Sequence, residues 1–378
     1  MGFLEEFSFL TEAFAAVTWQ HVVMWIIGGV LIFLAIVKKM EPSLLLPIGF
    51  GAILVNIPLS NVLTDADTGA AGIIQWLYET TIETSEALPI LLFIGIGAMI
   101  DFEPLIRNPK LMVLGGFAQI GIFLTLLFAV LFGFPLLEAA AVAIIGAADG
   151  PTAILVANVL GSSYVGPITV VAYSYMALVP IIQPLVIRVL TTKKERRIRM
   201  DANVGKVSKP VKILFPILIT LIAGLIAPKS LALVGFLMFG NLIRECGVLG
   251  SLAETAQTTL ANLITLILGI TIAFQMQAEA FLNLQTLLIM ALGLFAFTFD
   301  TAGGVLCAKV MNLFCKKKIN PMVGAAGISA FPMSARVVHQ LGRKEDPSNY
   351  LLMHAVGANV SGQIASAIVG GLIIGLVL

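Results

Sequence analysis

The stretch from Gly146 to Ile154, GAADGPTAI, places an aspartate, two glycines and a proline inside a segment that is otherwise mostly apolar from Ala139 to Leu160. A carboxylate at mid-bilayer costs roughly 2.5–3.5 kcal/mol even on permissive insertion scales, so an acid there indicates a function. Pro151 directly follows Gly150 and has no amide donor, so a continuous helix is not expected. The pattern predicts a broken helix, or a re-entrant hairpin, with Asp149 at its tip.

A second interrupted stretch, NPMVGAAGISAFPMSAR, begins at Asn320 and ends at Arg336. If the two tips meet, four side chains offer oxygen ligands with one formal negative charge among them: Asp149, Thr152, Asn320 and Ser329. This set suits a monovalent hard cation. Backbone carbonyls freed beside Gly150 and Gly324 would complete the shell, as in other sites built from discontinuous helices.

Further polar residues have two readings each. The guanidinium fork of Arg336 suits a carboxylate, but an arginine near a span end also snorkels to the interface. Tyr175 supplies a hydroxyl or anchors a span at an interface. Asn359 is a further cation ligand or a hydrogen bond between helices. Asp101 and Asp300 fall near the predicted ends of spans, where solvated acids are common.

Composition fixes the class of protein. Hydrophobic residues make up 59% of the 378 residues and charged residues only 11%, which indicates a polytopic membrane protein of the all-α class. The net charge of +1 gives no case for nucleic acid. The three cysteines form no CxxC or Cys/His cluster, so neither a disulfide framework nor a zinc site is indicated.

The distribution of basic residues predicts the orientation. Lys38 and Lys39 close a first span and place its end in the cytoplasm, so the N-terminus is expected outside. Eight of the 22 basic residues fall between Lys193 and Lys212, which makes 191–212 a cytoplasmic loop. The predicted spans are Gln20–Val37, Ser43–Val55, Leu88–Ile100, Leu111–Phe134, Pro167–Leu190, Ile213–Ala227, Leu231–Gly250, Leu260–Phe274, Gln285–Ala308 and Tyr350–Leu378.

Counting crossings predicts the two hairpins. Because Leu111–Phe134 leads outward and Pro167–Leu190 must lead inward, the segment of about 136–161 between them has to begin and end outside. By the same count the segment of about 320–344 begins and ends inside. Residues 1–190 and 213–378 then form two halves of opposite orientation, an inverted repeat whose hairpin tips meet near the midplane, as in secondary transporters.

Four stretches together resemble the β subunit of the sodium-translocating biotin-dependent decarboxylases: GAADGPTAI, NPMVGAAGISAFPMSAR, VVAYSYMALVPIIQP and NYLLMHAVGANVSG. The resemblance runs over nearly the whole chain. That family includes the oxaloacetate, methylmalonyl-CoA and glutaconyl-CoA decarboxylase complexes. The residues that match its functional positions are Asp149, Tyr175, Asn320, Gly324, Ser329 and Arg336.

The resemblance implies an enzyme subunit of a prokaryotic inner membrane that decarboxylates carboxybiotin and exports sodium ions. It implies a biotin carrier, a carboxyltransferase α subunit and a small membrane-anchoring subunit as partners, and it allows a homo-oligomer. Arg336 would pair with the carboxylate, sodium would bind between Asp149 and the second tip, and Tyr175 or Asp149 would relay the proton. The compact length of the chain favours an acyl-CoA decarboxylase.

The residues by themselves fit a second class equally well, a sodium-coupled secondary transporter of a small carboxylate. A passive channel is a third reading, less favoured because paired tips with an acid favour an occluded site. Co-purification with a biotinylated carrier and a carboxyltransferase would separate the first two.

Overall fold

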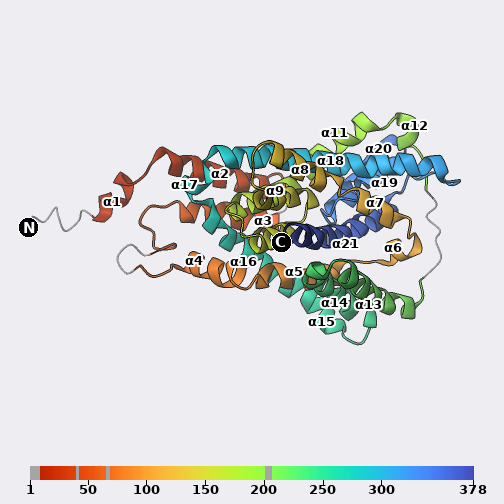
Figure 1. The fold of residues 1–378 in the computed structure, drawn as a ribbon, viewed down its shortest axis with the longest axis horizontal. Helices are drawn as coiled ribbons and strands as arrows, with labels where there is room; N and C mark the ends of the chain where they lie inside the picture. The colour runs from red at the N-terminus through yellow and green to blue at the C-terminus, as the bar shows by residue number, and fades with distance from the viewer. Residues whose placement is uncertain (1–8, 40–41, 65–68, 201–206) are drawn as a thin grey trace, which may run out of the picture.

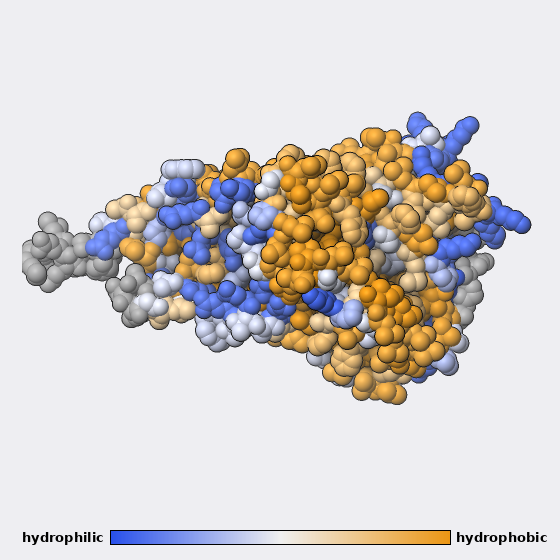
Figure 2. Space-filling model, viewed as in Figure 1, coloured by the Kyte–Doolittle hydropathy of each residue, from blue (hydrophilic) through white to orange (hydrophobic). Residues whose placement is uncertain are grey.

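The computed structural model describes residues 9–39, 42–64, 69–200 and 207–378 as a bundle of helices (Figure 1). Six of its helices are long and apolar enough to cross a membrane, or up to eight if each of two bent pairs is one span. Figure 2 shows hydrophobic side chains gathered over the middle of the visible face, with hydrophilic ones at the end where α12 lies. The expected all-α, polytopic class is confirmed.

The first half of the chain runs from a short α1 (Phe9–Ala15) to the long α11. Its elements are α2 (Trp19–Ile36), α3 (Pro42–Val55), α4 (Ile73–Tyr78), the π-helix η1 (Glu79–Glu83), α5 (Ala87–Met99), α6 (Glu103–Arg107), α7 (Leu111–Phe117), α8 (Ile120–Leu131), α9 (Leu136–Ala143), η2 (Ile144–Ala147), α10 (Gly150–Val159) and α11 (Val165–Leu190). Two pairs of helical segments in this half are bent at a break: α4–η1 meets α5 at 68°, and α11 turns by 67° between Met176 and Leu178.

The second half repeats this order of elements. After α12 (Lys193–Arg196) come α13 (Lys209–Ile226), η3 (Pro228–Ser230), α14 (Leu231–Cys246), α15 (Gly250–Thr255), the π-helix η4 (Ala256–Leu260), α16 (Ala261–Ile272), η5 (Ala273–Met276), α17 (Ala278–Phe281), α18 (Leu284–Phe314), α19 (Pro321–Ala325), α20 (Met333–Glu345) and α21 (Leu352–Val377). In each half a helical pair comes first, then an apolar segment that contains a π-helix, then a span, a broken segment and a final span.

Several helices of one half pack on helices of the other. The helix α3 packs on α16, and its counterpart α14 packs on α5. In the same way α11 packs on α18, and its counterpart α21 packs on α7. The two broken segments and the four spans α7–α8, α11, α18 and α21 make up most of the largest buried cluster of apolar side chains, which also reaches α5, α13 and α14.

The basic stretch of 191–212 is tied to the end of the bundle, apart from 201–206, which lie outside the described residues. Thr192 and Glu195 form a capping box at the start of α12. Arg196 pairs with Glu345 at 2.7 Å, which joins α12 to the end of α20. Lys212 pairs with Glu103, and this contact lowers the pKa of that carboxyl to about 2. The ion pairs hold this end of both halves together.

Candidate functional site

The predicted break at the first stretch is confirmed. The helical turn η2 ends at Ala147, Ala148 has a left-handed φ of 51° and Asp149 is extended, with a φ of −140°. The helix α10 then begins at Gly150 with Pro151 in its first turn, where the missing amide costs no hydrogen bond. Gly150 and Pro151 thus lie directly after the break, in the first turn of the new helix.

The two arms of this segment return to one end of the molecule. Glu138, in the first turn of α9, accepts hydrogen bonds from the hydroxyl of Ser162 and, at 3.0 Å, from the amide of Ser163. The rings of Phe134 and Tyr164, which flank the segment, lie 5.9 Å apart in an edge-to-face contact. The segment is therefore a helical hairpin in shape, closed at its base by Glu138 and bearing Asp149 at its break.

Asp149 lies at the N-cap of α10 and is only 2% exposed. Its Oδ2 accepts a hydrogen bond of 2.5 Å from the hydroxyl of Thr152, which is itself fully buried. The carboxylate and the hydroxyl that the sequence proposed as ligands therefore lie together. The N-terminus of α10 stabilises negative charge at this position.

The tyrosine that packs on this break is Tyr173. A Cβ atom on Gly150 would lie 2.1 Å from the Tyr173 ring, so only glycine allows the ring to cover the residue after Asp149. Tyr173 is fully buried, and its hydroxyl has no hydrogen-bond partner among the described residues. Tyr173 was not among the predicted site residues, although its place two positions before Tyr175 in AYSYM was a visible signal.

Tyr175 points elsewhere. Its hydroxyl donates to the carbonyl of Met290 on α18 at 2.5 Å, and its ring packs over Gly293. It lines a cavity of about 610 Å³ between α2, α11 and α18, together with Ser174, Thr286 and other residues. The structure thus separates Tyr175 from Asp149, and its predicted proton relay to that site stays a prediction.

The second broken segment is also a hairpin in shape, and Asn320 lies at its base. The Asn320 amide donates to the carbonyls of Arg196 and Ile198 at 2.9 and 2.8 Å. Asn349, just after α20, donates to the same two carbonyls, each at 3.2 Å. The side-chain oxygen of Asn320 caps α19 by accepting a hydrogen bond from the backbone amide of Met322. Contrary to the expectation, Asn320 is therefore not at the tip.

Three side-chain amides from other segments hold the tip of this hairpin. Gln119, at the interruption between α7 and α8, donates to the carbonyl of Gly327 at 3.4 Å. Asn359 on α21 donates to the carbonyl of Ile328 at 2.6 Å, and Gln363 donates to that of Ser329. Because carbonyls only accept, these contacts fix which atom of each amide is the nitrogen. The amide oxygens of all three are buried without a partner among the described residues.

Ser329 and Gly324 have different places in this hairpin. The Ser329 hydroxyl is fully buried and donates to the carbonyl of Gly362 at 2.9 Å. Gly324 lies in α19, where a Cβ would be 2.0 Å from the carbonyl oxygen of Gly304 on α18. The carbonyl of Gly324 accepts from the amide of Gly327 at 3.0 Å. Gly324 thus serves close helix packing, and the expectation that carbonyls beside Gly150 and Gly324 complete a cation shell stays a prediction.

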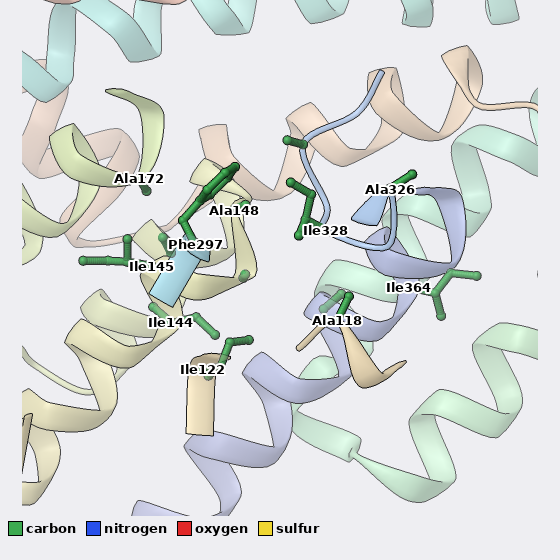
Figure 3. Packing of buried hydrophobic residues seen from close by; sticks show 14 of the residues in the cluster. Ala118, Ile122, Ile144, Ile145, Ala148, Ala172, Phe297, Ala326, Ile328 and Ile364 are labelled. Atoms are coloured by element: carbon green, nitrogen blue, oxygen red, sulfur yellow. The ribbon is translucent and has the colours of Figure 1, made fainter. Parts of the chain in front are cut away.

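The two tips lie one after the other along α21. Gln363 touches the second tip, whereas a Cβ on Gly370 would lie 3.0 Å from the methyl group of Thr152. Seven residues of helix separate these contacts, or about 10 Å of rise. Ala148 and Ile328, from the two tips, belong to one buried cluster with Phe297 of α18 (Figure 3). The structure thus brings together Asp149 with Thr152, and Ser329 with Asn359.

Arg336 is separate from both groups of oxygens. It is an exposed residue of α20, whose neighbours Ala335 and Val337 are buried, and it forms no ion pair with any residue that the structure describes. Its guanidinium is therefore available to an anion.

Asp300 corrects a second expectation. It is not a solvated acid at a span end, because it lies near the middle of α18 and is 0% exposed. The helix that contains FTFDTAGG continues to Phe314, and this places the acid inside the helix and not at its end. Asp101 does lie at the end of a span, where its carboxylate accepts from the amide of Glu103 at 2.9 Å.

Residues 20–377 match the family described as the Na+-transporting oxaloacetate decarboxylase beta subunit. The chain is 45% identical to the methylmalonyl-CoA decarboxylase subunit beta of Propionigenium modestum, with 97% of each chain covered. It is 47% identical to the glutaconyl-CoA decarboxylase subunit beta of Acidaminococcus fermentans, covering 97% of this chain and 96% of the relative. It is 42% identical to an oxaloacetate decarboxylase beta chain of Salmonella typhi, covering 94% of this chain and 95% of the relative.

Proposed function

Because the chain belongs to the family of Na+-transporting oxaloacetate decarboxylase beta subunits, we propose that it decarboxylates carboxybiotin and couples this reaction to the export of sodium ions. The observation that carries the coupling is the buried pair of Asp149 and Thr152 at the break of the first hairpin. A buried carboxylate needs a counter-charge, and a sodium ion bound by oxygen ligands supplies it.

The proposed architecture is an inverted repeat. Two observations support it: the elements follow the same order in the two halves, and helices of one half pack on the corresponding helices of the other. In addition, each half contains one hairpin, and the bases of the two hairpins lie at opposite ends of the molecule. In a membrane, both hairpins would be re-entrant, because irregular backbone at that depth is tolerated only inside protein or beside water. Residues 1–190 and 213–378 are the two repeats, joined by the basic loop of 191–212.

In the proposed mechanism, carboxybiotin arrives from the cytoplasm and Arg336 holds its carboxylate through two parallel N–H donors. Decarboxylation breaks the bond between the carboxyl carbon and the ring nitrogen, and the electron pair stays on the nitrogen, which takes one proton as carbon dioxide leaves. Sodium binds at Asp149 and Thr152, and Ser329 with Asn359, elsewhere along α21, forms a separate group of oxygens for a sodium ion. Moving one charge against about 100 mV costs about 2.3 kcal/mol, which the decarboxylation must supply.

Biotin would be carried by a partner subunit, so a biotin carrier, a carboxyltransferase α subunit and a small membrane-anchoring subunit belong to the proposal. The alternative is a sodium-coupled transporter of a small carboxylate, which the same oxygens and arginine would serve. Purification from the host membrane and a probe for biotin separate the two, since the pump retains a biotinylated polypeptide. A preparation free of biotin and of decarboxylase activity contradicts the pump.

We assign the upstream substrate to the acyl-CoA class. The alignments with the methylmalonyl-CoA and glutaconyl-CoA relatives extend over 386 and 366 residues, close to the length of this chain, whereas that with the oxaloacetate relative extends over 412. The co-purified carboxyltransferase tests this assignment, because it should accept an acyl-CoA acid and not oxaloacetate.

The proposed topology can be tested by labelling in intact cells. Single cysteines at Ser85 and Ser163, in a background with the three native cysteines replaced by alanine, should react with an impermeant maleimide from outside. Cysteines at Lys194 and Ser348 should react only after lysis, because they lie at the basic end. If Ser163 reacts only after lysis while Ser85 reacts outside, the first broken segment crosses the membrane and the inverted repeat fails.

The Ser329→Ala variant tests the second group of oxygens. Loss of one hydrogen-bonding hydroxyl costs about 0.5–1.5 kcal/mol, so the sodium concentration for half-maximal activity should rise about two- to tenfold. The matched control is Ser366→Ala, because Ser366 is equally buried on α21 but bonds only the carbonyl of Gln363, on its own helix. An unchanged sodium dependence in Ser329→Ala removes Ser329 from the ligands.

A further inference from the structure

Asp300 is a second buried acid that the proposed mechanism leaves unused. It lies near the middle of the 31-residue α18, between the contacts of this helix with the two hairpins. Its Oδ1 accepts from the amide of Gly121 at 2.6 Å. Its Oδ2 is buried and has no hydrogen-bond partner in the part of the chain that the structure describes.

The carboxyl group occupies a space kept open by two glycines. Gly121 lies in the first turn of α8, just after the break that separates α7 from α8. Gly146 lies in η2 of the first hairpin. A Cβ on Gly121 would be 2.6 Å from Oδ1, and a Cβ on Gly146 would be 2.7 Å from Oδ2. The side chain therefore joins α18 to both the broken span α7–α8 and the first hairpin.

No side chain neutralises this group. Four elements that pack on α18, namely α7, α8, η2 and α19, carry no ionisable residue. Of the others, α9 brings Glu138, held by two serines at the hairpin base, and α11 brings Arg188 in its last turn. The tyrosines of α11 are Tyr173, whose ring covers Gly150, and Tyr175, whose hydroxyl donates to Met290. On α18 itself, Lys309 pairs with Glu195 at 3.0 Å.

An ionised carboxylate in these surroundings would keep one oxygen unpaired in a medium of low dielectric constant, which is costly. A sodium ion would need several oxygen ligands, but Oδ1 is already occupied by an amide and Oδ2 faces the backbone of Gly146. A proton needs no such shell.

We propose that Asp300 is a proton-binding carboxyl of the transport core, which holds a proton in the conformation described here and is separate from the sodium-binding Asp149. This inference rests on the proposed function for its role, since decarboxylation of carboxybiotin consumes one proton per turnover. The position of Asp300, against η2 and the interruption between α7 and α8, links release of that proton to movement of the first hairpin.

The protonation itself can be tested without biotin or partner subunits. The purified full-length chain is treated with dicyclohexylcarbodiimide, which reacts with protonated carboxyl groups in apolar surroundings, and modified peptides are identified by mass spectrometry. The Asp300 peptide should be labelled, less so as pH rises, and equally with and without sodium chloride, whereas Asp101 should stay unlabelled. Protection by sodium would make Asp300 a cation ligand, and absence of labelling would show an ionised group; either result overturns the proposal.

The role in turnover is tested with Asp300→Asn in the complete complex in proteoliposomes. Asparagine still accepts from Gly121, so assembly and binding of radioactive sodium should match wild type. Turnover should fall on the order of 100-fold, the lower limit for positioned proton-transfer groups, and lose its pH dependence. Asp300→Glu should recover part of the activity, and Asp101→Asn should stay near wild type.

Wild-type turnover with an unchanged pH profile in Asp300→Asn would mean that Asp300 has only a structural role, as the acceptor that caps the N-terminus of α8. If this variant fails to assemble, carbodiimide labelling of the unmodified chain decides the proposal. If labelling succeeds while no preparation contains biotin, the proposed function fails and the proton site stands.

Discussion

Replacement of Asp149 by asparagine should abolish sodium transport while the complex stays assembled. The amide keeps the shape of the carboxylate and an oxygen that accepts from Thr152, so the hairpin break should persist. The formal negative charge is lost, and removing one charge from a buried ion pair costs about 3–5 kcal/mol, or at least about 100-fold in sodium affinity. Uptake of radioactive sodium by inverted vesicles during decarboxylation measures the effect.

The matched control is Glu138→Gln, which removes a charge at the base of the same hairpin and keeps an acceptor for Ser162. It should transport sodium at a rate close to wild type. Sodium-stimulated decarboxylation near the wild-type rate in Asp149→Asn would show that the cation binds elsewhere.

A second large effect is expected for Arg336→Lys. Lysine keeps the positive charge but lacks the planar fork, so a carboxylate held by two parallel hydrogen bonds loses one of them. Hydrogen bonds to charged groups contribute about 1.5–3 kcal/mol, so decarboxylation of carboxybiotin should fall about 10- to 100-fold. Sodium binding in the absence of biotin should be nearly unchanged, because both groups of oxygens remain.

The control on the same helix is Arg343→Lys. Arg343 lies 5.5 Å from the centre of the Tyr350 ring in the last turn of α20, a contact that a lysine also makes. Wild-type turnover in Arg336→Lys would mean that this residue acts as a general positive charge or an interface anchor, and that carboxybiotin binds elsewhere.

Local chemistry in the sequence determined much of the fold. The pair Gly150 and Pro151 cannot continue a helix, and the break lies directly before them. The long apolar runs gave the spans, because only about 20 such residues cross a bilayer. The proximity of Asp149 and Thr152 was also predictable, because residues three apart at the start of one helix lie on the same face.

Contacts over long distances in the chain were decided by the tertiary structure alone. Residues two apart on a helix differ by about 200° in direction, so either Tyr173 or Tyr175 could face Asp149, and only the packing of α11 on Gly150 selected Tyr173. The sequence placed Asn320 and Ser329 in one interrupted stretch. Their separation into base and tip depends on α12 and α21, which lie far away in the chain.

The burial of Asp300 has the same origin. In the sequence, Asp300 is a single acid within an apolar helix. The local sequence does not reveal how much of that helix is buried in the bundle or which helices pack on it. Gly121 and Gly146 come from more than 150 residues earlier in the chain, and their lack of side chains is what makes room for the carboxyl group. Burial is a property of the assembled helices, and so the environment of this acid could be known only from the fold.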